Sequence, residues 1–202
     1  MVVPLPIHPV TAHPILFGKL PAHGDFVARG LDLPAHEAWD EWISAGLGAA
    51  RERLGERFEE EHDSVPPWRF IDGPGDLGEA WRAGALAPSI DAAGRRFMIM
   101  LAAEGLSQGE AGGGGEAIAE AMEGLIYQAF ESDWDADSVI EAARRPLSDL
   151  TDEPVGAPRR RWWTLGGPEH DPAVVEGGPQ GVLARMFAAD AAAGRDAMRG
   201  QA

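Results

Sequence analysis

Apolar and small side chains recur at helical spacing over a long segment that begins near residue 32. Asp32 can cap the start of a helix, and Pro34 fits the first turn, where a missing N–H costs little. The positions that follow lie on one face of a helix of about five turns. They are Trp39, Trp42, Ile43, Gly46, Leu47, Ala50 and Leu54. We expect this face to be largely buried against a sheet.

Short apolar runs between turn residues predict the strands of that sheet. Such runs occupy residues 14–20, 68–71, 81–87 and 160–165. Residues 96–102 are apolar at successive positions, so both faces of this strand should be covered, as in the centre of a sheet. The proline–serine–aspartate turn between the third run and this strand predicts a hairpin.

Further periodic segments predict helices at residues 116–131, 136–146 and 180–193. The glycine-rich residues 105–115 predict a flexible loop, the segment most prone to local disorder. Adjacent Trp162 and Trp163 should point to opposite sides of their strand, so both are buried only if the sheet is covered on both sides.

Strands and helices without regular βαβ alternation predict an α/β fold, a layered sandwich with a mostly antiparallel or mixed sheet and helices on both faces. The 202 residues predict a single domain over residues 1–202, with a core at about 15–190. We expect the N-terminal lead-in and the C-terminal tail to be flexible.

Composition narrows the classes of function. A formal net charge of −16 disfavours binding to nucleic acid or to an anionic membrane. It suits either solubility alone or a partner with a basic patch. The absence of cysteine excludes thiol catalysis and cysteine-based metal sites. No apolar run is long enough to span a membrane, and prolines interrupt the N-terminus where a signal peptide would be apolar. We therefore expect a cytoplasmic protein.

Two turns hold the residues with catalytic potential. His23 and Asp25 could act as a general base with its orienting carboxylate, and Ser89 with Asp91 could complete a hydrolase or phosphatase-like site. The alternative is that these side chains bond the backbone of their own turns. Ser89 lacks a GxSxG context, and the six histidines show no metal-ligand spacing. The sequence therefore favours a non-enzymatic interaction or regulatory protein, with neither cofactor nor metal.

An ordered set of short segments resembles the TagF (ImpM-type) family associated with bacterial type VI secretion. The set comprises residues 17–26 (FGKLPAHGDF), 30–31, Trp39, Trp42, 67–70 (PWRF), Trp81, Gly84, 88–91 (PSID), 94–97 (GRRF) and 162–164 (WWT). Two positions depart from the family pattern, because His23 stands where Ser or Arg is usual and Met98 stands where proline is usual. Both lie in turns or at strand starts.

The resemblance implies a cytoplasmic accessory protein that represses assembly or firing of the secretion machine after translation. Members of the family work through the forkhead-associated (FHA) scaffold protein, alongside the threonine kinase and phosphatase that control it. No catalytic residues are implied, and any phosphatase should be a separate chain.

Under this resemblance, the turns at residues 20–26 and 88–96 should lie together at one end of the sheet, where loops on a rigid scaffold often carry binding residues. Their partner-binding patch would consist of Lys19, His23, Asp25, Asp91, Arg95 and Arg96. Lys19 is the only lysine of the chain. The alternative is that the two aspartates tie their own turns and that Lys19 or Arg95 neutralises them internally.

Overall fold

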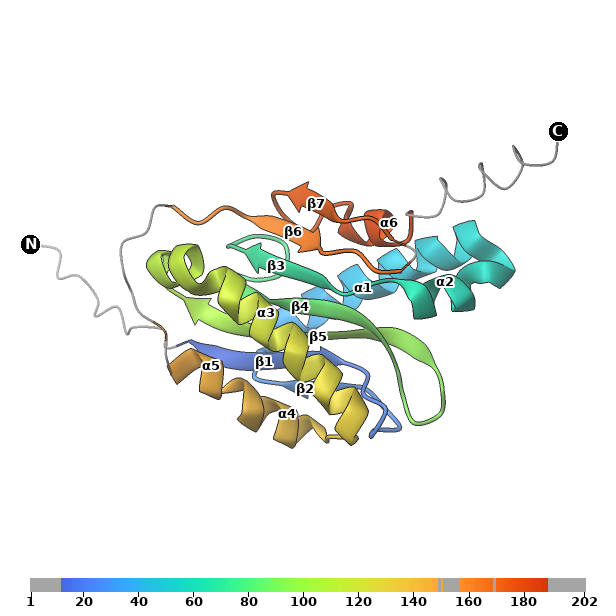
Figure 1. The fold of residues 1–202 in the computed structure, drawn as a ribbon, viewed down its shortest axis with the longest axis horizontal. Coiled ribbons are helices and arrows are strands. Elements are labelled where there is room, and N and C mark those ends of the chain that lie inside the picture. The colour runs from blue at the N-terminus through green and yellow to red at the C-terminus, as the bar shows by residue number, and fades with distance from the viewer. Residues whose placement is uncertain (1–11, 149, 151–156, 169, 189–202) are drawn as a thin grey trace, which may run out of the picture.

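The fold is a seven-stranded antiparallel sheet with helices on both faces, seen here in a computed structural model (Figure 1). The structure describes residues 12–148, 150, 157–168 and 170–188. The strands are β1 His13–Gly18, β2 Val27–Arg29, β3 Trp68–Asp72, β4 Trp81–Ile90, β5 Arg96–Leu106, β6 Arg161–Thr164 and β7 Ala173–Glu176. Their order across the sheet is β2-β1-β5-β4-β3-β6-β7. The predicted layered α/β architecture is confirmed.

The helices divide between the two faces. They are α1 Leu33–Leu54, α2 Phe58–Ser64, α3 Gln108–Ser132, α4 Ala136–Ala143, α5 Arg145–Ser148 and α6 Val182–Met186, with a 3₁₀ turn at Gly55–Arg57. One face, called the α1 face, packs against α1, α2 and α6, and the opposite α3 face packs against α3 and α4 (Figure 1). None of the helices in the described ranges is both long and apolar enough to cross a membrane.

The central strand β5 is apolar on both sides. Met98 and Met100 point to the α1 face, whereas Ile99 and Leu101 point to the α3 face, and all four are fully buried. Because strand side chains alternate, burial at successive positions requires a covering layer on each face. The prediction of a central strand is confirmed.

Helix α1 is joined to the sheet by an aromatic cluster. Asp32 caps the helix, because its side chain accepts a hydrogen bond from the N–H of Ala35 (2.9 Å). Trp39 is fully buried, with its ring centroid 5.8 Å from that of Phe70 and 6.3 Å from that of Trp162. The predicted cap and apolar stripe are therefore confirmed at these positions. The neighbouring Trp42 is only partly buried at the edge of this cluster.

The two adjacent tryptophans of β6 point to opposite faces, as predicted. Trp162 is fully buried on the α1 face. Trp163 lies on the α3 face, where it is only partly buried. The α3 layer therefore covers the sheet less completely at β6 than at β5.

The prediction of a flexible loop at residues 105–115 is wrong, because α3 begins inside it. Ser107 and Glu110 form a capping box: the Ser107 hydroxyl accepts from the N–H of Glu110 (3.1 Å), and the Glu110 carboxylate accepts from the N–H of Ser107 (2.7 Å). A Cβ atom at Gly115 would lie 2.8 Å from Cδ1 of Ile71. Absence of this atom lets the helix approach β3 closely, so packing and capping override the low helix propensity of glycine.

Other differences concern short or terminal elements. Strands β2 and β7 were not expected, since strands of three or four residues carry little periodicity of their own. The expected helix at residues 136–146 is divided into α4 and α5, and α6 occupies only part of the expected helix at 180–193. The expected lead-in and tail fall mostly on residues 1–11 and 189–202, outside the described residues.

We expect Trp39→Ala to destabilise the protein by roughly 3–5 kcal/mol, because it removes a fully buried aromatic side chain from the α1 face. Urea unfolding measures this loss. Leu33→Ala, at a residue of the same helix that is 69% exposed, serves as the control and should cost below about 1 kcal/mol. If Trp39→Ala lowered the free energy of unfolding as little as the control does, this would contradict the burial of Trp39 between α1 and the sheet.

We expect Gly112→Ala to stabilise the protein by about 0.5–1 kcal/mol, because Gly112 is exposed within α3 and alanine is the better helix former. Thermal unfolding tests this directly. Gly115→Ala is the matched control, since its new methyl group would crowd Ile71 and offset the gain. A Gly112→Ala protein of unchanged or lower stability would argue that this segment is not helical.

Candidate functional site

Two turns meet at one end of the sheet, as the family resemblance implies. The first, residues 20–26, follows β1, and the second, residues 91–95, joins β4 to β5. The carbonyl of His23 accepts a hydrogen bond from the N–H of Ala92 (2.8 Å). The guanidinium of Arg95 donates to the carbonyl of Gly24 (2.6 Å). The two turns therefore form one bonded unit.

Glycine fixes the start of this unit. Gly18 has a φ of 129° and lies against β5, where a Cβ atom would be 2.1 Å from the carbonyl oxygen of Met98. No other residue fits both the backbone conformation and the close approach. The chain then turns, and the N–H of Lys19 bonds the same carbonyl oxygen (3.1 Å).

The carboxylate of Asp91 lies at the centre of the unit. One oxygen accepts from the backbone N–H groups of Ala93 (3.0 Å) and Arg95 (2.9 Å). The other accepts from Nζ of Lys19 (2.9 Å) and Nε of Arg95 (2.7 Å). Burial alone would raise the pKa of this carboxyl, but the hydrogen bonds from Lys19 and Arg95 outweigh it and hold the pKa far below its usual range.

Lys19 is also an interior residue. Its side chain is 7% exposed, pairs with Asp91, and lies with Nζ 5.1 Å from the ring centroid of Phe26. The hydroxyl of Ser89 donates to the carbonyl of Lys19 (2.7 Å). Lys19 and Asp91 therefore neutralise each other inside the unit rather than facing outward.

The outward side chains of the unit are aromatic, aliphatic and charged. Phe26 is 47% exposed and Ile90 is 40% exposed. The side chain of Arg95 is 60% exposed although it bonds Asp91. Asp25 is also exposed. We call Asp25, Phe26, Ile90 and Arg95 the turn patch. Sequence reasoning missed Phe26 and Ile90, because an apolar residue at a strand end gives no sign of its exposure.

Arg96 and His23 connect the unit to neighbouring helices. Arg96 pairs with Asp63 (2.7 Å) and Glu59 (3.0 Å) of α2, and its hydrogen bond lowers the pKa of the Asp63 carboxyl. Nε2 of His23 accepts a hydrogen bond from the N–H of Ala136 at the start of α4 (3.0 Å).

The hydrolase hypothesis gains no support from these contacts. Asp25 accepts from the N–H of its neighbour Phe26 (2.8 Å), and His23, Ser89 and Asp91 bond other groups, as described above. Within the described part of the chain, no hydrogen bond joins two of the four proposed catalytic side chains. Two surface hollows of ≈450 Å³ each lie elsewhere, one beside Trp42 and one beside Tyr127.

Comparisons with known proteins agree with this fold. Residues 16–145, which include both turns, match the family model described as the TagF N-terminal domain, type VI secretion system-associated. The crystal structure of PA0076 from Pseudomonas aeruginosa PAO1 superimposes with a TM-score of 0.70 at 24% identity, over 86% of this chain and 93% of that chain. This similarity shows a shared fold. A search of curated proteins finds no match.

We expect Asp91→Asn to lower the urea midpoint at pH 7 and pH 5, because it removes the carboxylate that joins the turns. The folded-state pKa of Asp91 lies below the unfolded value of about 3.9, so its contribution is complete above that value and is lost as the pH falls further. The gap between wild type and variant should therefore narrow at pH 3.

The matched control for this experiment is Asp25→Asn, because Asp25 is an exposed aspartate of the same unit. Its urea midpoint should stay close to that of the wild type at every pH. A gap for Asp91→Asn that is equally wide at pH 3 and pH 7 would contradict the role of the ionised carboxylate.

Proposed function

This chain belongs to the TagF N-terminal domain family associated with type VI secretion, and from that premise we propose that it is a non-enzymatic regulator of the secretion machine. It binds the FHA-domain scaffold protein and represses assembly or firing. It acts in the cytoplasm and is linked in function to the threonine kinase and phosphatase that control the scaffold. One domain carries this activity.

The contacts of the polar side chains support a binding role. Ser89 and Asp91 are buried and bonded to structural groups, and His23 is bonded to the start of α4. A nucleophile or general base needs a partner within hydrogen-bond reach and access to a substrate. These residues instead hold the two turns in one conformation, which is what a preformed binding surface needs.

The observation that best supports this binding function is the turn patch. Asp91 and Lys19 fix the two turns from inside, so Phe26 and Arg95 are presented outward with little freedom to move. Aromatic and arginine side chains dominate the binding energy of many protein interfaces. We assign the contact to the turn patch and place His23 and Arg96 at its margin, where they anchor it.

The charge of the chain suits a partner with a basic surface. The net charge of −16 speeds association with such a surface at low ionic strength. Asp25 adds a carboxylate beside Phe26, whereas Arg95 supplies a cation for an acidic group on the partner. The turn patch therefore suits a partner surface that carries both positive and negative groups rather than groups of one sign.

We expect the protein to bind the purified FHA scaffold of its own bacterium, and Arg95→Glu to weaken this binding at least about tenfold, or about 1.4 kcal/mol. Isothermal titration calorimetry measures both affinities. Arg53→Glu is the matched control, because Arg53 is exposed on α1 and undergoes the same change of charge. The control should bind like the wild type.

Because Arg95 also bonds Asp91, melting temperatures must accompany the binding data. Phe26→Ala provides a second variant that leaves the ion pair of Asp91 intact, and it should weaken binding to a similar extent. Absence of wild-type binding at concentrations on the order of 100 µM would refute the scaffold as the partner. Normal binding by both folded variants would refute the turn patch.

A further inference from the structure

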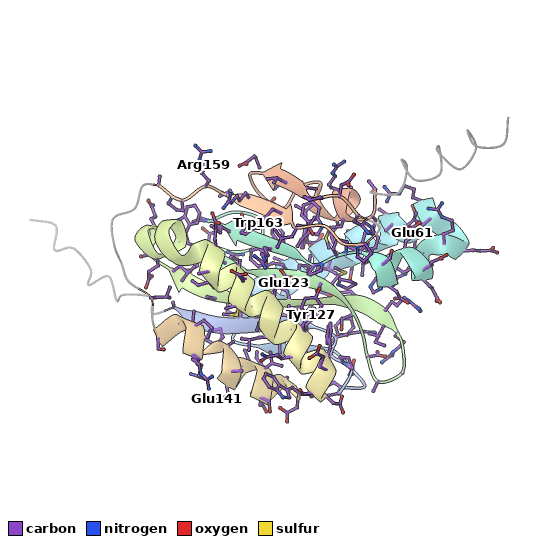
Figure 2. All side chains as sticks on the ribbon, viewed as in Figure 1. Glu61, Glu123, Tyr127, Glu141, Arg159 and Trp163 are labelled. Carbon is purple, nitrogen blue, oxygen red and sulfur yellow. The ribbon has the colours of Figure 1, made fainter. Side chains whose placement is uncertain are left out.

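The α3 face of the sheet is only partly covered at the hairpin β6–β7. Helix α3 packs mainly against β3, β4 and β5, and Glu116 of α3 also pairs with Arg161 of β6. Trp163 is partly exposed, Leu165 is 64% exposed, and Val174 is 58% exposed on this side. Figure 2 shows Trp163 outside the path of α3. Exposed apolar side chains that share one sheet face mark an interaction surface.

The edge of the sheet beside these residues is also open. Strand β7 comes last in the strand order, and no strand pairs with its outer edge in the ranges that the structure describes. The N–H of Gly177 bonds the carbonyl of Arg160 (2.8 Å). Antiparallel bonding alternates along a strand, so Ala173 and Val175 bond β6, whereas Val174 and Glu176 direct their backbone groups outward.

The surroundings of this edge carry the densest cationic run of the chain, Arg159–Arg161. The guanidinium of Arg161 lies 4.7 Å from the ring centroid of Trp163 and pairs with Glu116 of α3. Arg160 is held by Asp72 on the opposite face (2.8 Å). Arg159 is exposed and makes no hydrogen bond or ion pair with the described residues, and Figure 2 shows it pointing away from the sheet.

We propose that an extended acidic segment of a partner protein binds here by adding an eighth strand to β7. Its backbone pairs with Val174 and Glu176, and its apolar side chains contact Trp163 and Val174. Its carboxylates lie near Arg159, whose charge no described residue neutralises. Main-chain bonds supply the affinity of this mode of binding, and side chains supply its specificity.

Charge argues against a second copy of this chain as the occupant. The residues of β7 are Ala173, Val174, Val175 and Glu176, so a second copy would offer this edge one carboxylate in a strand of only four residues. Each chain also carries a net charge of −16. The edge lacks lysine and proline within the strand, which natural sheets often use to prevent unwanted pairing.

Two labelled peptides test the proposal by fluorescence anisotropy: one alternates valine and glutamate, and the other alternates valine and lysine. We expect saturable binding of the glutamate peptide, and binding of the lysine peptide at least about tenfold weaker. Backbone amides of Val174 and Glu176 should gain protection from hydrogen exchange when the glutamate peptide is added to the wild type. No saturable binding, equal binding of both peptides, or unchanged exchange would overturn the proposal.

Two variants locate the site on this edge. Arg159→Glu should weaken binding of the glutamate peptide at least about fivefold, whereas the matched Arg53→Glu on α1 should change it less than about twofold. Val174→Pro removes an outward N–H without removing a bond to β6, so it should abolish binding with little change in melting temperature. Equal effects of the two charge reversals would place the contact elsewhere.

Sedimentation velocity of the protein without peptide tests whether a second copy of this chain pairs with β7 instead. We expect a monomer. A dimer that Val174→Pro dissociates would assign the edge to a second copy and overturn the proposal. If Val174→Pro does not fold, the charge-reversal pair and the hydrogen exchange of the wild type still decide the question. The surface is separate from the turn patch, so these outcomes are independent of binding to the FHA scaffold.

Discussion

The architecture depends on one constraint, which is that the central strands are apolar on both sides. Burial of Met98 and Ile99 at successive positions of β5 demands a helical layer above and below the sheet. Helices α1 and α3 cover the two faces at the centre of the sheet, and each contributes to its own cluster of buried side chains. The sheet has seven strands, and α3 packs mainly against β3, β4 and β5, so the face of β6–β7 beyond it is only partly covered.

The end of the sheet where the two turns meet depends on a second constraint, which is the burial of the Asp91 carboxylate. Asp91 can lie inside the protein only because four donors surround it, two from its own turn's backbone and two from cationic side chains. Lys19 comes from the other turn, so satisfying Asp91 also fixes the distance between the turns. The geometry of the turn patch is therefore set from within by Asp91 and Lys19, which are themselves buried.

Much of this arrangement could be predicted from local sequence. Asp32 and the stripe around Trp39 define α1, and the apolar run of β5 defines a central strand. The meeting of the two polar turns follows from the family resemblance and not from local sequence. Contacts distant in sequence could not be predicted, since nothing near His23 indicates that its ring bonds Ala136, 113 residues away. The start of α3 carried a signal in the capping box of Ser107, which the following glycines outweighed in the sequence-based interpretation.

The position of Lys19 has a consequence for the covalent chemistry of the protein. It is the only lysine of the chain, and its amine is buried, paired with Asp91 and placed beside the ring of Phe26. Acylation requires room for the reagent around the amine, and the folded protein does not offer it at this buried residue. Acetylation and other modifications directed at lysine therefore have no accessible lysine target in the folded chain. Acylation of Lys19 would instead show that this end of the sheet has unfolded.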